Sequence, residues 1–427
     1  MLRKPNAEPS SLELCLGAAG NRRSQLRIRI MRNLLLFVSA VASLMAVRWI
    51  YFRVLNFARH KNISDCPDER KLQKRPVPVM GGVAVFFGFV FGALAGFAGM
   101  SAMGMHPVVN VLPVVPVMLI MMYIGFMDDN GGLSPLSRIV FEVLAVLALI
   151  GVSGGCIDSF HGLWGVDEFS WWIAVPLTVL ASVGIINSIN MIDGVNGLSS
   201  GLCIVYSLMF GLAFIYANDM GNAILAFSAA AALMPFFTHN VFGARSKMYI
   251  GDAGTMMFGI LMSWFVICLL RSDSRLQYTA SMYHFNMVAL ALAILSVPVA
   301  DTLRVMLTRI KHGDSPLKPD RKHLHHAFIR MGMSHAFTAF IEIFIDLVIV
   351  AVWFVAVYSG AGLDMQLYIV IAACVMFVWG LYFVFEWNAA RDTRFFRWLT
   401  HVSLATQVGN TRWWSIIQLF VDKNKRK

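Results

Sequence analysis

The chain has 427 residues, of which 58% are hydrophobic and only 14% are charged, with a mean hydropathy of +0.67. Soluble domains carry about 25% charged residues, so this composition excludes an ordinary soluble protein. The formal net charge of +11 indicates membrane orientation rather than a nucleic-acid partner, because the loops of membrane proteins carry orienting Lys and Arg residues. Six scattered cysteines without a CxxC motif argue against a disulfide framework or a zinc site.

Long apolar runs recur along the whole chain. A bilayer-spanning helix needs about 20 mostly apolar residues, so the runs predict an all-α polytopic membrane protein with 10–11 transmembrane helices. We expect one transmembrane domain over residues 33–388 and a basic cytoplasmic tail over 389–427. The runs lie near residues 33–55, 79–100, 108–127, 138–155, 171–188, 198–217, 221–242, 254–270, 285–305, 339–360 and 367–387.

The loops between these runs differ in charge. Lys and Arg are concentrated in alternate loops and in the tail, which places those loops and the C-terminus inside the cell. Eleven spans would then put residues 1–32 outside, although this segment is basic. We expect a poorly ordered arm there, and we expect the native chain to start at Met31, where Arg-Asn and an apolar run follow.

The stretch 187–201 is unusually polar for a segment between two apolar runs. Its oxygen-bearing side chains include Asn190, Asp193 and Asn196. Gly194 and Gly197 disfavour a continuous helix through it. Polar, bent backbone at the edge of a membrane is costly unless it lines a site, so we interpret the stretch as part of a functional site rather than a simple turn.

Further acidic residues stand at the ends of other spans. Asp128 and Asp129 are adjacent carboxylates at the inner end of the third run, where they oppose the helix dipole. Solvated acids at a helix end are the alternative interpretation. Asp252 lies between glycines at the start of the eighth run, and there a metal ligand and a simple N-cap are equally compatible with the sequence.

Two basic segments lie in inner loops. Segment 314–326 contains Arg321, His323, His325 and His326, of which the first and last histidines are spaced to share a helix face. No Cys or Glu accompanies them at zinc-binding spacing, so we expect them to bind phosphate oxygens. Segment 67–82 adds cations, a Pro-x-Pro and a glycine pair, although by itself it is only a basic loop.

All five polar clusters fall on the predicted cytoplasmic side. Carboxylate and Asn oxygens suit Mg²⁺, while Arg, Lys and His suit phosphates. The combination predicts Mg²⁺-assisted chemistry on a diphosphate, with Mn²⁺ as an alternative metal. A nucleotide-sugar transporter is the remote alternative, because transporters place their site near the midplane between repeats.

Together the clusters resemble the polyprenyl-phosphate N-acetylhexosamine-1-phosphate transferases (glycosyltransferase family 4), most closely the bacterial undecaprenyl-phosphate N-acetylglucosamine branch. The resemblance covers about residues 34–390. The matching motifs are Arg70-Lys71 through Pro76-x-Pro78 and Gly81-Gly82, Asp128-Asp129, Asn187-x-x-Asn190-Met-x-Asp193-Gly, Gly251-Asp252-Ala-Gly and Pro319-Asp-Arg-x-His323-x-His325-His326.

This resemblance implies an enzyme of the bacterial inner membrane whose active site faces the cytoplasm. Such an enzyme moves a sugar 1-phosphate from a UDP-sugar to undecaprenyl phosphate and releases UMP, which initiates a cell-envelope glycan. N-acetylglucosamine is the expected sugar, with another UDP-N-acetylhexosamine or UDP-MurNAc-pentapeptide as alternatives. Members need Mg²⁺, and a homodimer is compatible with the resemblance.

The resemblance also implies residue roles. Asp252 would be the main metal ligand, assisted by the side-chain oxygen of Asn190. Asp128 and Asp129 would engage the lipid phosphate or the metal, with a base role left open. The expected substrate-binding residues are Arg138, Asp193, Asn196, Tyr249, Arg321, His323, His325 and His326.

Several positions depart from the family pattern. Many bacterial relatives have Asp where Asn196 stands, so a carboxylate role does not carry over. Pro135 and Leu136 stand where a basic residue is usual, which leaves Arg138 as the nearby cation, and Asn240 has no assignable role. Four further acids within the spans are expected to pair for structural reasons: Glu142, Glu342, Asp346 and Glu386. Asp301 could be either structural or functional.

Overall fold

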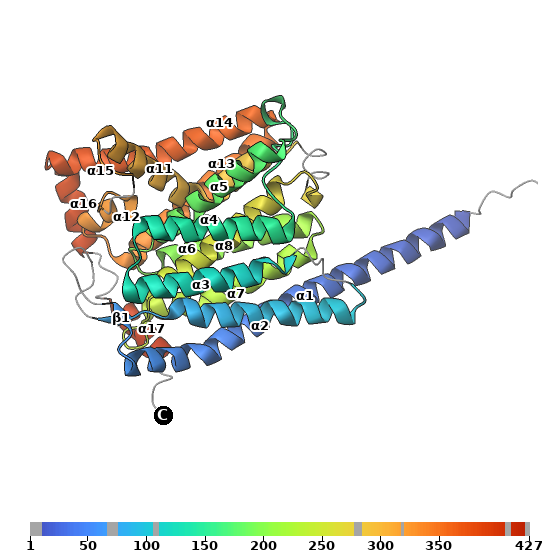
Figure 1. Ribbon diagram of the computed structural model, residues 1–427, viewed down its shortest axis with the longest axis horizontal. Coiled ribbons are helices and arrows are strands. Elements are labelled where there is room, and N and C mark those ends of the chain that lie inside the picture. The colour runs from blue at the N-terminus through green and yellow to red at the C-terminus, as the bar shows by residue number, and fades with distance from the viewer. Residues whose placement is uncertain are drawn as a thin grey trace, which may run out of the picture.

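The computed structural model describes residues 11–65, 76–105, 111–276, 284–316, 320–405 and 411–422. The chain forms a bundle of long helices running side by side, with one small strand pair at the end where the C-terminus lies (Figure 1). The elements are α1 (Ser11–His60), β1 (Ser64–Asp65), β2 (Val77–Pro78), α2 (Gly81–Ala102), α3 (Val114–Gly131), α4 (Pro135–Ser153), η2 (Leu163–Gly165), α5 (Trp171–Met191), α6 (Leu198–Tyr216), α7 (Met220–Phe242), α8 (Gly251–Leu270), α10 (Met287–Ile294), α11 (Ser296–Lys311), α12 (Leu324–Arg330), α13 (His335–Tyr358), α14 (Leu363–Cys374), η3 (Val375–Gly380), α15 (Leu381–Ala390), α16 (Arg394–Ala405) and α17 (Arg412–Asp422).

The number of spans agrees with the sequence. Ten of the described helices are long and apolar enough to cross a membrane, and a bent pair brings the number to 11. The prediction of an all-α, multi-pass membrane protein is confirmed.

The ninth apolar run is broken rather than continuous. Helices α10 and α11 meet at 81° around Leu295. Pro298 has no backbone N–H and is best tolerated in the first turn of a helix, and the new helix begins two residues before it, at Ser296. Asp346 of α13 accepts hydrogen bonds from Ser296 Oγ (2.9 Å) and the Val297 N–H (3.4 Å) at this break.

The N-terminal segment also differs from the prediction. Helix α1 begins at Ser11, so residues 11–32 are helical rather than a disordered arm. Its first turns project beyond the bundle (Figure 1). Good helix formers such as Leu, Ala and Arg dominate this segment and continue into the apolar part without a proline. Residues 1–10 lie outside the described part of the chain.

Helix α8 occupies the centre of the bundle, and each of its residues except Asp252 is buried. Glycines on its neighbours allow this close packing. A Cβ on Gly82 of α2 would lie 2.4 Å from the Gly254 backbone nitrogen, and one on Gly125 of α3 would lie 2.4 Å from the Asp252 carbonyl oxygen. The start of α8 is thus held between α2 and α3, which fixes Asp252 in place.

The strand pair links distant segments at this end of the bundle. Strands β1 and β2 are antiparallel, with Asp65 opposite Val77. The backbone of Tyr249 extends the contact, since its N–H donates to the Pro78 carbonyl (2.8 Å) and its own carbonyl accepts from the Gly81 N–H (2.8 Å). The segments that precede α2 and α8 are therefore joined.

Candidate active site

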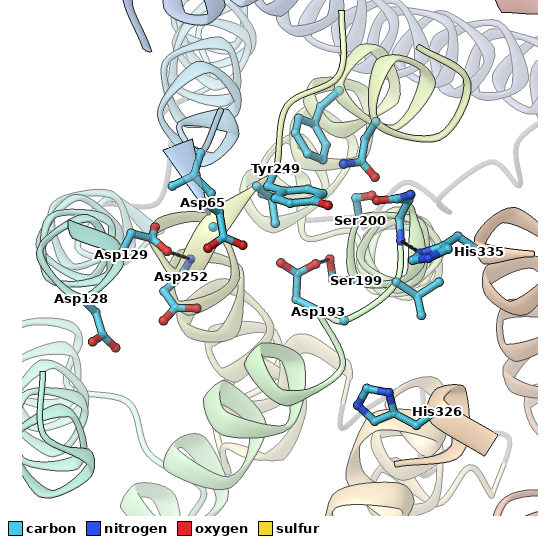
Figure 2. Close-up of a pocket in the computed structure, with 18 residues that line it drawn as sticks. Asp65, Asp128, Asp129, Asp193, Ser199, Ser200, Tyr249, Asp252, His326 and His335 are labelled. Carbon is cyan, nitrogen blue, oxygen red and sulfur yellow. Dashed lines mark hydrogen bonds between the residues drawn. The ribbon is translucent and has the colours of Figure 1, made fainter. Parts of the chain in front are cut away.

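A pocket of about 480 Å³ opens at the end of the bundle that carries the strand pair. This is large enough for a ligand of drug or nucleotide size. Figure 2 shows acidic side chains on one side of the pocket, with His326 and His335 on the opposite side. Seven of the predicted site residues line it: Asp128, Asp129, Asp193, Asn196, Tyr249, Asp252 and His326.

Asp129 caps the N-terminus of α8. Its two carboxylate oxygens accept hydrogen bonds from the backbone N–H groups of Asp252 (3.0 Å) and Ala253 (3.2 Å). Gly251, the residue before them, has φ +71°, and a Cβ there would lie 2.4 Å from Asp129 Oδ2. Only glycine fits this backbone and this contact without strain. An anion at a helix N-terminus is also stabilised by the helix dipole.

Asp252 is held in a fixed orientation by α5. The Asn190 side-chain amide donates to Asp252 Oδ1 (2.8 Å) and to Thr255 Oγ1 (2.9 Å). The Asn190 oxygen in turn accepts from Arg138 Nη1 (3.5 Å). The two residues predicted to hold the metal are therefore adjacent, with the Asn190 oxygen directed to Arg138.

Arg138 lies behind the acidic side of the pocket. Its guanidinium is 3.7 Å from Asp128 Oδ2 and 3.8 Å from Glu142 Oε1, and it donates to Asn187 Oδ1 (3.4 Å). Glu142 also accepts from the Asn187 amide (2.5 Å). Arg138, the cation nearest to the Asp pair in the sequence, thus contacts Asp128. Glu142, expected to be only structural, belongs to this network, and its i, i+4 spacing from Arg138 was the available signal.

Asp193 projects into the centre of the pocket from the turn between α5 and α6. Burial raises the pKa of its carboxyl to about 7; the hydrogen bond from Ser199 opposes this shift, and the charge of Asp252 adds to it. Next to it, the Asn196 backbone N–H donates to His335 Nδ1 (3.3 Å). The polar stretch 187–201 therefore forms one wall of the pocket.

Tyr249 covers the pocket near Asp193 and Asp65. Burial raises the pKa of its phenol to about 12, so the ring stays neutral at physiological pH. The Lys247 ammonium lies 5.8 Å from the centre of the Tyr249 ring, within reach of a cation–π contact. Burial lowers the pKa of Lys247 to about 8.

Of the three histidines, only His326 lines the pocket. His323 is the N-cap residue of α12. Its Nδ1 lies 2.8 Å from Asp301 Oδ2, and the side chain does not line the pocket. His325 is buried against Gly194, where a Cβ would lie 2.8 Å from its Nε2. His326 does line the pocket, and burial followed by the charges of neighbouring cations lowers its pKa to about 4.

Arg321 is exposed and does not line the pocket. The expected shared helix face of His323 and His326 is wrong, because α12 begins only at Leu324. The basic residues Arg70 and Lys71 lie outside the described part of the chain.

Several lining residues were missed by the sequence reasoning. Asp65, Asn240 and His335 all face the pocket. Asn240 joins two of its walls, because its oxygen accepts from the Gly197 N–H (2.7 Å) and its amide donates to the Met248 carbonyl (2.9 Å). Asn240 carried a sequence signal, an amide in an apolar helix, whereas Asp65 and His335 carried none.

The donor set suits a hard divalent cation. Asp128, Asp129, Asp193 and Asp252 gather around one pocket, with Arg138 as the cation in ion-pair contact. Within the described residues, no three His, Cys, Asp or Glu side chains form a ready-made metal cage. Mg²⁺ is commonly held by one or two carboxylates and completed by substrate phosphates and water. The residues present fit that mode.

Residues 111–270, which supply most of this acidic wall, match the family model described as glycosyl transferase family 4. This part of the chain is similar to the glycosyl transferase family 4 domain. This confirms the resemblance seen in the sequence.

Three curated relatives to which the chain is similar have related names. The chain is 29% identical over 305 residues to a probable undecaprenyl-phosphate N-acetylglucosaminyl 1-phosphate transferase of Bacillus subtilis, covering 71% of this chain and 80% of the relative. It is 26% identical over 303 residues to the undecaprenyl-phosphate alpha-N-acetylglucosaminyl 1-phosphate transferase of Yersinia pestis (70% and 76%). It is 28% identical over 310 residues to a decaprenyl-phosphate N-acetylglucosaminephosphotransferase of Mycolicibacterium smegmatis (70% and 75%).

Proposed function

We propose that this protein transfers N-acetylglucosamine 1-phosphate from UDP-N-acetylglucosamine to undecaprenyl phosphate and releases UMP. The observation that carries the proposal is the pocket, where Asp128, Asp129, Asp193 and Asp252 gather at the end of a membrane bundle. The relatives with this domain are named for N-acetylglucosamine and for polyprenyl phosphates. A lipid acceptor explains why the pocket lies at the ends of membrane-spanning helices.

The reaction forms one phosphorus–oxygen bond and breaks another. An oxygen of the lipid phosphate attacks the phosphorus that carries the sugar. The bond from that phosphorus to the bridging oxygen breaks, and UMP leaves with this oxygen. A phosphomonoester with a second pKa near 6 is mostly dianionic at pH 7, so the acceptor needs positioning rather than deprotonation.

The residues in and behind the pocket wall divide between the two substrates. Arg138 and Asp128 lie together beside α3 and α4, where the Arg138 guanidinium can pair with the lipid phosphate. Tyr249 offers a ring for stacking on uracil, and Asp193 and Asn196 offer hydrogen-bonding groups for the nucleotide sugar. His326, neutral at pH 7, can donate a hydrogen bond to a phosphate or sugar oxygen.

We further propose that Asp252 is the main ligand of Mg²⁺ and that Asn190 or Asp128 is a second ligand. When bound, the ion would neutralise the diphosphate charge as it shifts to the leaving UMP. The side chains have a separate task. Asp129 holds the α8 N-terminus and Asn190 holds Asp252, so the acidic groups keep their spacing when the substrates enter.

We also place the enzyme in the bacterial inner membrane with this pocket facing the cytoplasm. The support is the charge pattern, because the basic loops and the tail share the pocket's side of the bundle. A cysteine at exposed Ser134, labelled from one side of sealed membrane vesicles, tests the orientation; labelling only from the periplasmic side would contradict it.

The test of function uses the purified full-length protein. UMP release should require UDP-N-acetylglucosamine, undecaprenyl phosphate and Mg²⁺ together. A panel of UDP-sugars, including other N-acetylhexosamines and UDP-MurNAc-pentapeptide, identifies the donor. If no UDP-hexosamine yields UMP, the proposal is wrong.

A further inference from the structure

The C-terminal tail folds into two helices, α16 and α17, at the same end of the bundle as the pocket (Figure 1). One side of α17 packs on the protein. Its Trp414 ring lies 5.1 Å from the Phe242 ring at the end of α7, and its last residue, Asp422, reaches the turn that follows α7. The tail is therefore attached to the segment that connects α7 to α8.

Asp422 binds this turn through four hydrogen bonds. Its carboxylate accepts from the backbone N–H groups of Ala244 (3.2 Å), Arg245 (2.9 Å) and Ser246 (3.0 Å), and from Ser246 Oγ (2.6 Å). Charge-assisted bonds of this kind are about twice as strong as neutral ones. A single side chain from the end of the chain thus satisfies three consecutive backbone donors.

The turn leads directly into the pocket. Tyr249 follows Ser246 by three residues, and Met248 between them is bonded to Asn240, another lining residue. The turn 244–246 is therefore joined to Tyr249 by a short, hydrogen-bonded segment.

The opposite side of α17 is apolar and exposed. Trp413, Ile416 and Phe420 are 76%, 52% and 80% exposed, and their spacing of three and four residues puts them on one helix face. No described side chain covers them. On α16, the exposed rings of Phe395 and Trp398 repeat this pattern.

Charge and position indicate what covers this face. The exposed side chains of Arg394, Arg397 and Arg412 accompany the aromatic rings, and both helices lie where the membrane-spanning helices end. A helix with Trp, Phe and Ile on one face and Arg beside it lies in the membrane interface, where its cations meet anionic headgroups. A face directed into water would expose two large aromatic side chains at a cost in free energy.

We propose that α17 lies in the headgroup layer of an anionic bilayer, and that Asp422 couples this surface-bound helix to the turn 244–246 and so positions Tyr249. The coupling to catalysis rests on the proposed function. The membrane contact of α17 does not, and neither do the hydrogen bonds between Asp422 and the turn 244–246, which we call the latch.

The membrane contact is tested with nitroxide labels on the full-length protein in vesicles of phosphatidylglycerol and phosphatidylethanolamine. Labels at Phe420→Cys and at Ser415→Cys are compared in a background without native cysteines. The Phe420 label should be more accessible to oxygen than to a water-soluble nickel chelate, and the Ser415 label should show the reverse. Equal nickel access at both positions would overturn the proposal, and so would spin–spin broadening at Phe420 from a second copy of the chain.

The latch is tested by hydrogen exchange of residues 244–246 in Asp422→Ala. Loss of the charged acceptor should speed exchange of these amides about tenfold. Asp392→Ala is the control, because this exposed tail residue pairs only with the nearby Arg397 among the described contacts. Unchanged exchange in Asp422→Ala would overturn the latch. Neither this readout nor the nitroxide readout requires turnover, so both stand if the proposed reaction is wrong.

The coupling is tested by kinetics. In Asp422→Ala, KM for the UDP-sugar should rise about fivefold, the equivalent of one net hydrogen bond, while KM for polyprenyl phosphate stays the same. A fall in kcat with both KM values unchanged would overturn the positioning role of Asp422.

Discussion

The contact between Gly251 and Asp129 gives the sharpest test of how the pocket is built. In Gly251→Ala, a Cβ would lie 2.4 Å from Asp129 Oδ2, whereas real Cβ atoms do not come closer than 3.0 Å. The two groups must therefore separate by about 0.6 Å. Alanine at φ +71° adds about 1–2 kcal/mol, and an overpacked contact adds about 1–3 kcal/mol.

The consequence reaches both stability and rate. We expect about 2–5 kcal/mol of lost stability, together with a fall in kcat/KM of about 10- to 100-fold, because the bond from Asp129 to the Asp252 N–H is displaced. Thermal unfolding in detergent and UMP release measure the two effects. Gly151→Ala in α4 is the matched control, since a Cβ there meets nothing within 4 Å. Wild-type melting and wild-type kcat/KM in Gly251→Ala would refute this account of the site.

Four further changes test other parts of the molecule. Asp252→Asn should lower turnover by orders of magnitude and weaken its dependence on Mg²⁺, and unchanged turnover would exclude a metal-ligand role. Asp301→Asn removes the carboxylate that pairs with buried Arg304 and His323, so the melting temperature should fall by the equivalent of about 3–5 kcal/mol; wild-type melting would contradict this. Asp167→Ala, on an exposed loop far from the pocket, should change stability by less than about 0.5 kcal/mol and leave turnover unchanged. Burial raises the pKa of Asp422, but its hydrogen bonds from Ser246 and the neighbouring N–H groups outweigh this and lower it overall. Its stabilising effect should therefore be fully present above about pH 4 and should decline as the pH falls below that value. A gap in melting temperature between wild type and Asp422→Asn that does not narrow at all below about pH 4 would contradict the latch.

The sequence was informative where one physical signal dominates. Bilayer thickness sets the length of the spans, so the apolar runs located them to within a few residues. Charged loops follow the membrane orientation, and this placed the polar clusters on one side before any packing was known. The pocket brings together residues from all five clusters, because Val79 of the partly described segment 67–82 also lines it.

The sequence was uninformative where tertiary packing decides. The direction of His323 depends on Asp301, a buried acid of another helix, and no local pattern encodes that pairing. Asp65 enters the pocket through a two-residue strand that is too short to give a periodic signal. The helix over residues 11–32 was missed because charge was taken as the sign of disorder, although its residues favour a helix.

The central position of α8 has a consequence for the working environment of the enzyme. Bilayers differ in thickness, and helices exposed to lipid adapt by tilting or shifting. Helix α8 is shielded from lipid over its whole length by the surrounding helices, and its first turn is fixed by Asp129 and by the glycines of α2 and α3. The position of Asp252 relative to the other site residues is therefore set by contacts within the protein. The outer helices can follow changes in membrane composition while the reacting groups keep their geometry.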